Sequence, residues 1–490
     1  MLEVRELPAA VDLRSTLDAL GDATHVILAE NTAVPSGRDR WAFLATGPVC
    51  VFRSVRERCW AGPPGRERRL ADPPLDALAA LLRRRHLRRD GVAPPWCSGA
   101  GGYLGYGLLH EIEHVADRHA DVDGPDDCHL AFFDAVAATD LVSRRSWVAG
   151  RDPTAVDRLA ALMEKARPLV ATHAEKERPR TVNPEAFTHL GVTPCMPRDA
   201  YLDAIASIDA HLLAGDCYEV CLTQRFDSTY RGSGVGLYDA LCRTSPAPHA
   251  AYVRAPGVEI ACASPELFLR AGGDGRVETR PIKGTRPRGR DAAEDAALAA
   301  DLAHAPKDAA ENLMIVDLAR NDLGRVCEYG SVTVPELRVV ETHAHTHQLV
   351  STVTGRLRAD VDAVDLLRAA FPGGSMTGAP KVAAMSIIDA LEPVPRGPYA
   401  GAIGWFDDSG TLELDMVIRS LVKTGDRVSF HTGGAIVADS DPQAEYQESL
   451  DKAAGMLAAL AHARPDVQPV SADTSAAADP GMPGRPKVAR

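Results

Sequence analysis

The sequence predicts an α+β protein built from antiparallel sheets with helices packed on them. Between residues 218 and 432, short strand-like runs follow one another in groups and do not alternate strictly with helices, which is typical of antiparallel sheets. The 40 glycines and 35 prolines among 490 residues indicate many turns. Hydrophobic residues make up 45% of the chain, which is sufficient for an extensive core.

Composition divides the chain into four segments. Residues 1–171 are rich in Arg, Ala and Pro and are expected to form an N-terminal domain. Residues 172–198 are polar and contain several prolines, so they are predicted to be a linker. Residues 199–463 hold the clearest pattern of helices and strands. Residues 464–490 lack hydrophobic periodicity and are predicted to be a disordered tail.

Three helices mark the third segment. Asp199 is expected to cap a helix that carries a hydrophobic stripe and ends at Gly215. Further helices are expected over residues 308–323 and 442–461. Strands are predicted at residues 218–224, 258–263, 266–270, 277–282, 331–334, 348–357, 400–406, 414–422 and 427–432.

Charge and composition exclude several classes of protein. A net charge of −13 argues against binding of a nucleic-acid backbone. No run approaches the roughly 18 apolar residues of a membrane span, and the N-terminus lacks the apolar stretch of a secretory signal. The ten cysteines are scattered without a C-x-x-C pair, so reduced thiols are expected rather than a zinc site. These features predict a cytoplasmic globular protein.

Two of the predicted helices carry pairs of carboxylates on one face. Asp308 and Glu311 are three residues apart in the earlier helix, and Glu445 and Glu448 are three apart in the last one, with Lys452 on the same face. Two such pairs could hold a hard cation such as Mg²⁺, which prefers oxygen ligands. Spacing alone favours solvated faces with ion pairs, so the metal site is an alternative at this point.

Three glycine-rich stretches resemble anion- or nucleotide-binding loops to different degrees. Residues 433–436 (GGAI) follow a predicted strand, so their backbone N–H groups could approach an anion, although a plain tight turn fits as well. Residues 371–381 (FPGGSMTGAPK) resemble a phosphate loop but lack its Lys-Ser/Thr end, which argues against a nucleotide triphosphatase. Residues 101–107 (GGYLGYG) lack dinucleotide-binding spacing and predict a turn or a strand with close backbone approach.

One strand end is dense in cations. In residues 279–288, Lys283 lies near Arg280 and Arg286, and desolvation there would disfavour its ammonium form and suit it to nucleophilic attack. An anion-binding or surface lysine is the simpler interpretation. Glu266 lies among apolar neighbours that could raise its pKa and suit it to acid catalysis.

Several ordered motifs together point to one enzyme family. They are residues 215–220 (GDCYEV), 263–268 (ASPELF), 280–289 (RPIKGTRPRG), 311–322 (ENLMIVDLARND), 349–351 (LVS), 378–381 (GAPK), 399–404 (YAGAIG), 418–420 (IRS) and 439–442 (DSDP). With these motifs, the chain resembles the chorismate-utilising enzymes over about residues 200–460. This family includes anthranilate synthase component I and the aminodeoxychorismate, isochorismate and salicylate synthases.

The resemblance implies a fold and a site. The implied fold is a two-layer sandwich of antiparallel sheets flanked by helices, interlocked with an N-terminal domain of the anthranilate synthase component I type. The implied cofactor is Mg²⁺, held by Glu311 and Glu448, with Asp308 and Glu445 acting through water. The carboxylates of chorismate would be held by Gly284, Thr285, Ser375, Tyr399, Arg419, Gly434, Ala435 and Lys452.

Three positions discriminate between members of the family. Isochorismate and salicylate synthases carry a water-activating lysine where this chain has Glu219, so addition of water is disfavoured. Lys283 replaces the small residue of anthranilate synthase and matches the lysine that attacks the ring in aminodeoxychorismate synthases. Gln348 replaces a histidine that several aromatising relatives carry, and strand alternation would turn the preceding His347 to the other face.

The resemblance therefore implies a large subunit of the aminodeoxychorismate synthase type. Such a protein would convert chorismate and ammonia to 4-amino-4-deoxychorismate for p-aminobenzoate biosynthesis, with Lys283 as nucleophile and Glu266 as acid. The alternatives are an anthranilate synthase component I and a non-catalytic chorismate-binding protein.

Ammonia is expected from a separate glutamine amidotransferase subunit, because the sequence shows no G-x-C-x-G-like nucleophile loop. Residues 28–31 (LAEN) depart from the Leu-Leu-Glu-Ser pattern of tryptophan-regulated relatives, so feedback inhibition by tryptophan is not expected.

Overall fold

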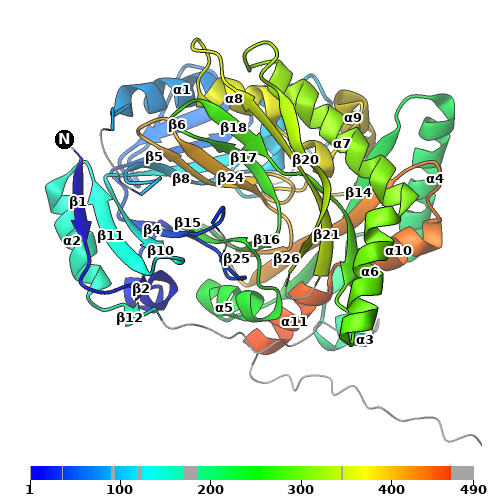
Figure 1. The fold of residues 1–490 in the computed structure, drawn as a ribbon, viewed down its shortest axis with the longest axis horizontal. Coiled ribbons are helices and arrows are strands. Elements are labelled where there is room, and N and C mark those ends of the chain that lie inside the picture. The colour runs from blue at the N-terminus through cyan, green and yellow to red at the C-terminus, as the bar shows by residue number, and fades with distance from the viewer. Residues whose placement is uncertain are drawn as a thin grey trace, which may run out of the picture.

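Two large antiparallel sheets form the centre of the molecule, and helices cover them (Figure 1). The structure is a computed structural model that describes residues 2–35, 37–89, 94–119, 124–169, 185–343 and 346–464. The predicted α+β class, with antiparallel sheets and flanking helices, is confirmed. Among the described residues, no helix combines the length and the apolar character that crossing a bilayer requires.

The first sheet runs through strands from both ends of the chain. In spatial order its strands are β1 (Glu3–Glu6), β11 (Arg145–Gly150), β10 (Ala135–Asp140), β4 (Trp41–Thr46), β3 (Val26–Glu30), β15 (His249–Ala255), β16 (Val258–Ser264), β25 (Ser420–Thr424), β26 (Arg427–Ile436), β14 (Glu219–Thr229) and β13 (Thr193–Pro194), with β22 (Gly378–Ala379) beside β14.

The second sheet also combines strands from the N-terminal and C-terminal parts of the chain. In spatial order its strands are β19 (Ile282–Pro287), β21 (Thr346–Arg356), β18 (Arg276–Thr279), β17 (Leu267–Ala271), β24 (Leu412–Met416), β23 (Ala402–Asp407), β8 (Gly99–Leu104), β9 (Cys128–Phe133), β5 (Cys50–Val55), β6 (Arg58–Gly62) and β7 (Arg68–Arg69), with β20 (Thr333–Thr342) beside β21. A short ribbon pairs β2 (Val11–Asp12) with β12 (Arg167–Pro168).

Both sheets therefore combine strands from either side of the predicted linker. Strands β3 and β15 pair in the first sheet, and β8 and β23 pair in the second. The predicted segments 1–171 and 199–463 thus interlock through backbone hydrogen bonds. Part of the predicted linker, residues 172–184, and nearly all of the predicted tail lie outside the described residues.

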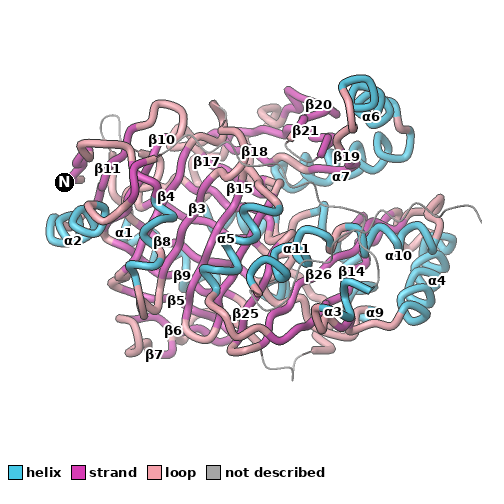
Figure 2. Tube along the Cα trace, turned by 90° about the horizontal axis from the view of Figure 1, so that it is seen from below, coloured by secondary structure: helices cyan, strands magenta, loops and turns pink. Residues whose placement is uncertain are grey.

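The helices pack on the outer faces of the sheets. They are α1 (Pro74–Arg85), α2 (Pro153–Met163), α3 (Glu185–His189), α4 (Arg198–Ala214), α5 (Gly234–Thr244), α6 (Ala292–His304), α7 (Pro306–Gly324), α8 (Ala363–Ala370), α9 (Lys381–Leu391), α10 (Pro442–Asp451) and α11 (Ala454–Ala463). In Figure 2, the end of the molecule far from the N-terminus has two parts. One part contains β19, β21 and α7, and the other contains β14, β26 and α10.

Aromatic rings fill the space between the two sheets. Phe43 of the first sheet lies 5.5 Å from Trp405 of the second and 5.9 Å from Trp96, measured between ring centroids. Glycines allow this close packing, because a Cβ on Gly101 would lie 2.8 Å from the Trp96 ring and one on Gly102 only 2.1 Å from the backbone oxygen of His129. The prediction of close backbone approach in this stretch is confirmed.

Three predicted elements are wrong in detail. The helix expected over residues 442–461 is two helices, because Ala453 N–H bonds to Leu450 and tightens the chain between α10 and α11. Asp199 does not cap α4, which begins at Arg198 after Pro197. The strand expected over residues 414–422 is divided between the two sheets as β24 and β25.

A buried ion pair fixes the end of α9 against β14. Arg396 donates to Glu392 at 2.6 and 2.8 Å, and also to the backbone oxygens of Met376 and Cys221 at 2.7 and 2.8 Å. Glu392 in turn accepts from the backbone N–H and hydroxyl of Thr223 at 2.9 Å. Both charged side chains are about 5% exposed or less, so each depends on the other for compensation.

Replacing Arg396 with alanine should therefore destabilise the fold strongly. The variant leaves the Glu392 carboxylate buried without its partner, so we expect a loss of about 3–5 kcal/mol in the free energy of unfolding. Urea denaturation followed by circular dichroism measures this loss. The exposed Arg356 variant, Arg356→Ala, should lose no more than about 1 kcal/mol. Equal losses in the two variants would contradict the assignment.

Candidate active site

Lys283 and Glu219 form a buried ion pair between the two sheets. Lys283, on β19, donates from Nζ to Oε1 of Glu219, the first residue of β14, at 2.5 Å. Glu219 is fully buried and Lys283 is 8% exposed. Burial disfavours the ammonium, but the Glu219 carboxylate outweighs it and raises the pKa of Lys283 above its usual range.

The prediction that desolvation near Arg280 and Arg286 disfavours the ammonium form of Lys283 overall is therefore wrong for this state. Arg280 donates to Glu341, and Arg286 donates to Asp301 and Asp308 at 2.7 and 2.9 Å, so both are neutralised by other carboxylates. The resting lysine is charged, and a chemical step that uses its lone pair has to remove a proton first.

Glu266 has the environment of a carboxylic acid rather than a carboxylate. It follows β16, is 5% exposed, and accepts a hydrogen bond from Ser375 Oγ at 2.6 Å. Burial raises the pKa of Glu266 to about 7, against the opposing effects of Ser375 and Lys283. A carboxyl group that titrates near neutrality is suited to donate a proton, as the sequence predicted.

A small cavity adjoins the Glu266 carboxyl. Its volume is about 30 Å³, which leaves room for a water-sized molecule. Ser375 and Thr279 contribute polar atoms, and apolar side chains such as Ile315 and Met416 line much of the remainder.

Three of the predicted metal ligands gather between α7 and α10. Lys307 Nζ lies 2.8 Å from Glu445 Oε1 and 3.9 Å from Glu311 Oε1, so one ammonium lies between two carboxylates on different helices. A Cβ built on Gly434 of β26 would lie 3.0 Å from Glu445 Oε2 and 3.8 Å from Glu448 Oε1. The glycine therefore leaves open the space beside both carboxylates.

The fourth predicted ligand, Asp308, lies against Gly284 of β19. Gly284 has φ +86°, and a Cβ there would lie 2.9 Å from the Asp308 side chain. Burial raises the pKa of Glu311 to about 7, although Lys283 acts in the opposite direction. Glu311 and Glu445 are buried and Glu448 is about half-exposed, and this group of carboxylate oxygens fits a hard divalent cation such as Mg²⁺.

The chain passes between the two sheets at Arg419, which is held in an unusual conformation. Arg419 has φ +49° and Ala400 beside the crossing has φ +60°, both in the left-handed region that L-residues avoid. Among the described residues, no carboxylate or carbonyl pairs with the Arg419 guanidinium. Burial lowers the pKa of Arg419, against the effect of Glu266. A largely buried, unpaired guanidinium is a receptor for an anion.

The remaining predicted substrate-binding residues surround these groups. Tyr399 is buried and stacks on the His431 ring at 4.7 Å. Lys452 is half-exposed, and its Nζ contacts the backbone oxygen of Gly433 at 2.9 Å and Glu448 at 2.7 Å. Ala435 lies on β26 beside Gly434, and Thr285 is exposed on β19 beside Gly284.

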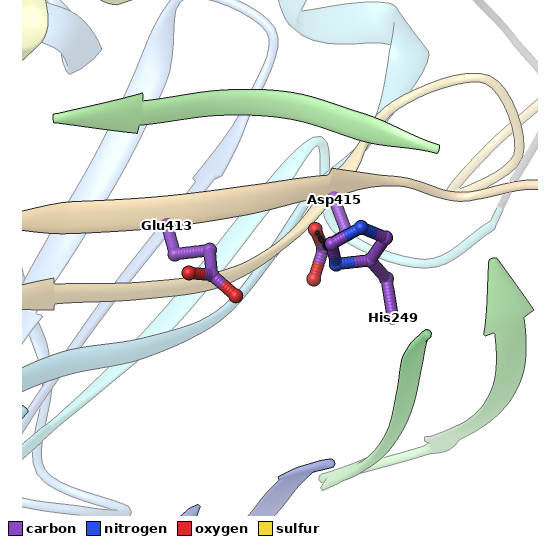
Figure 3. Close-up of side chains that lie close together, drawn as sticks. All are labelled: His249, Glu413 and Asp415. Atoms are coloured by element: carbon purple, nitrogen blue, oxygen red, sulfur yellow. Dashed lines mark ion pairs between the residues drawn. The ribbon is translucent and has the colours of Figure 1, made fainter. Parts of the chain in front are cut away.

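A further group of possible metal ligands was not found from the sequence. His249, Glu413 and Asp415 come from β15 and β24 and place ligand atoms within 4.8 Å of one another (Figure 3). His249 Nδ1 already lies 2.9 Å from Asp415, and Arg270 donates to Glu413 at 2.7 Å. Burial opposes charge on His249, but Asp415 raises its pKa, so these two side chains already form an ion pair with each other.

Sequence reasoning also missed Lys307 and the pairing of Glu219 with Lys283. Lys307 lies one residue before Asp308, within the predicted carboxylate face, so its charge could have been noted from spacing. The pairing of Glu219 with Lys283 has no local signal, since the two residues are 64 positions apart.

Known proteins are similar to this chain in sequence and fold. The chorismate binding enzyme family matches residues 26–458. The chain is 41% identical to an "Aminodeoxychorismate synthase" from Streptomyces pristinaespiralis over 94% of its own length, and it spans 65% of that relative. It is 44% identical to an "Aminodeoxychorismate synthase component 1" from Klebsiella aerogenes, covering 73% of this chain and 76% of the relative.

A solved structure supports the same relationship. Anthranilate synthase component I from Streptococcus pneumoniae TIGR4 superposes with a TM-score of 0.71 at 29% identity, covering 86% of this chain and 93% of that one. The predicted resemblance to the anthranilate synthase component I fold is confirmed.

Replacing Ser375 with alanine should move the titration of Glu266 to higher pH. The Ser375 hydroxyl stabilises the charged carboxylate, so its loss favours the protonated acid. Loss of a hydrogen bond worth about 1.5 kcal/mol should raise the proton affinity of Glu266 roughly tenfold. Difference infrared spectra against Glu266→Gln measure the carboxyl band across pH. The control variant at an exposed position, Ser386→Ala, should leave the titration of Glu266 unchanged. If Glu266 in Ser375→Ala titrates at the same pH as in wild type, or at a lower pH, the contact does not have this effect.

Proposed function

This chain belongs to the chorismate binding enzyme family, and we propose that it is the chorismate-aminating subunit of an aminodeoxychorismate synthase. Its reaction would convert chorismate and ammonia to 4-amino-4-deoxychorismate and water. The product is a precursor suited to p-aminobenzoate formation, because its amine is para to the ring carboxylate.

The observation that carries this proposal is the buried Lys283. Its amine lies inside the site, within electrostatic reach of Glu266, Glu311 and Glu448. Burial raises the pKa values of Glu266 and Glu311, and Lys283 opposes that rise. A lysine in this position can bond to the substrate ring, which a small residue cannot do. This chemistry favours amination through a covalent lysine adduct over direct addition of ammonia.

The proposed reaction uses two displacements. Neutral Lys283 attacks ring C2, the double bonds shift, and the C4 hydroxyl leaves as water with a proton from Glu266. Ammonia then attacks C4, the double bonds shift back, Lys283 leaves, and Glu266 recovers a proton from the new amine. Since Glu266 acts in both steps, water departs and ammonia arrives beside it, where the small cavity lies.

The surroundings of Gln348 support retention of the enolpyruvyl group. Gln348 is 1% exposed on β21, opposite Thr285 and Glu341. His347 instead contacts Thr342 and Asp295 through its two ring nitrogens, at 2.9 and 3.0 Å. Position 348 therefore lacks the histidine that several aromatising relatives carry there, which makes elimination of pyruvate less favourable. This favours the proposed activity over that of an anthranilate synthase component I.

We place a divalent cation, Mg²⁺, at the four carboxylates. Glu311 and Glu448 would hold it directly, with Asp308 and Glu445 acting through water. When bound, Mg²⁺ would neutralise a carboxylate of chorismate. The unpaired guanidinium of Arg419 would bind a carboxylate as well, together with Lys452 and the backbone N–H groups beside Gly434.

Ammonia is proposed to come from a separate glutamine amidotransferase subunit. The name of the Klebsiella aerogenes relative, component 1, supports a two-component enzyme. A reducing, cytoplasmic compartment is proposed because all ten cysteines are free thiols.

Purified protein supplied with chorismate, Mg²⁺ and ammonium salts should form a para-amine that retains its enolpyruvyl group. Lys283→Ala should lower formation of this product at least about 100-fold, because the covalent route is lost. Chromatography with mass spectrometry measures the product, and exposed Lys165→Ala is the matched control. Fluorescent anthranilate from wild type would identify an anthranilate synthase instead. Binding of chorismate without turnover would identify a binding protein.

Replacing Lys307 with alanine should strengthen the binding of Mg²⁺ and so lower the Mg²⁺ concentration that turnover requires. Its ammonium competes with a cation for Glu445 and Glu311, so the Mg²⁺ concentration for half-maximal turnover should fall about fivefold, as expected for about 1 kcal/mol at a half-exposed site. Turnover measured across a Mg²⁺ titration shows this change. An unchanged or higher Mg²⁺ requirement would place the cation elsewhere.

A further inference from the structure

We propose that Glu219 is a catalytic residue that takes the proton from Lys283 and thereby generates the nucleophilic amine inside the closed site. This inference rests on the proposed function and deepens it, because it assigns the step that precedes covalent attack. The family resemblance used Glu219 only to disfavour addition of water and gave it no role in catalysis.

The contact geometry supports Glu219 as the acceptor. Lys283 Nζ and Glu219 Oε1 are 2.5 Å apart, a distance typical of strong charge-assisted hydrogen bonds. Within the described ranges of the chain, Glu219 is the carboxylate in ion-pair contact with Lys283. The second carboxylate oxygen, Oε2, is buried and accepts no hydrogen bond from the described residues. Glu219 therefore has capacity to hold a proton without losing another partner.

The other titratable groups near Lys283 are less suited to this task. Glu266 accepts from Ser375 and has to be protonated itself to release the C4 hydroxyl. Glu311, from α7, belongs to the proposed metal site. Cys221 lies on the same strand as Glu219, and burial raises the pKa of its thiol, so it holds its own proton. Among the described carboxylates, Glu219 is the one that contacts Lys283 and has no other task in the proposed reaction.

The burial of both side chains makes the proton transfer accessible. Both side chains are buried, and a buried ion pair loses much of its hydration. A neutral amine beside a neutral carboxylic acid avoids that cost, so moving one proton over 2.5 Å exchanges two buried charges for none. No water is needed to carry the proton away.

The proton balance closes over one catalytic cycle. The Lys283 ammonium gives a proton to Glu219, and its lone pair then forms the bond to C2 while Glu266 protonates the departing C4 hydroxyl. The adduct carries a secondary ammonium. Ammonia bonds to C4 and passes a proton to Glu266, the bond from C2 to nitrogen breaks, and Lys283 leaves as a neutral amine. Glu219 then returns the stored proton to Lys283.

The test compares Glu219→Gln with wild type in the full chain, using chorismate, Mg²⁺ and ammonium salts. Glutamine keeps the shape but cannot accept the proton, so at neutral pH we expect kcat to fall about 100-fold, within the range of general base catalysis. The Kd for chorismate should change less than about threefold. Glu219→Asp, which keeps a carboxylate, should recover at least about a tenth of the wild-type rate.

A pH series separates this role from a structural one. In Glu219→Gln, burial acts on Lys283 without the opposing carboxylate, so the pKa of its ammonium falls, but the proton still has to leave to solvent, and alkaline pH promotes that loss. The ratio of variant to wild-type rate should therefore rise with pH. A variant rate within about threefold of wild type, or a low ratio that stays constant across pH, overturns the role of Glu219.

Failure of the proposed function would look different. If wild type forms no para-amine, or if Lys283→Ala is as active as wild type, the proposed reaction itself is wrong, whatever Glu219→Gln does. If wild type forms the para-amine through Lys283 and only the Glu219 variants behave as wild type, the proposed function stands and this inference fails.

Discussion

The site depends on one buried charge pair that spans the two sheets. Glu219 begins a strand of the first sheet, and Lys283 lies on an edge strand of the second, yet their side chains meet at 2.5 Å. Neither charge has enough water to be stable alone, so each side chain requires the other to be in place. The relative position of the two sheets is thus coupled to the ionisation of the proposed nucleophile.

The interlocked strands explain how two sheets can hold such a contact in register. Both sheets include strands from the N-terminal and C-terminal halves of the chain, so backbone hydrogen bonds resist sliding of one half against the other. Between the sheets, Phe43, Trp96 and Trp405 pack closely because glycines on β8 carry no side chain. At the crossing between β24 and β25, the same rigidity maintains Arg419 in a left-handed conformation that an isolated peptide would avoid.

Positive charges already neutralise much of the carboxylate cluster. Lys307 lies between Glu445 and Glu311, and Arg286 and Lys452 pair with Asp308 and Glu448. These contacts offset the repulsion among the four acidic side chains. Arg419, in contrast, has no ion-pair partner among the described residues. Under the proposed function, the carboxylate oxygens would serve a metal and this guanidinium an anionic substrate.

The sequence by itself determined the local features of this protein. Spacing and hydrophobic pattern within short windows account for the i, i+3 carboxylates on two helices, the buried Glu266, the glycine-rich strand ends and the general positions of many strands.

Tertiary structure alone decided which strands pair and which charged side chains meet. Residues 414–422 read as one apolar strand but cross from one sheet to the other, and no local pattern specifies that change. Lys283 acquired a carboxylate 64 positions away, which reversed the direction of its expected pKa shift. The physical reason is that the charge state of a buried group depends on the charges that the fold brings to it, and these come from distant parts of the chain.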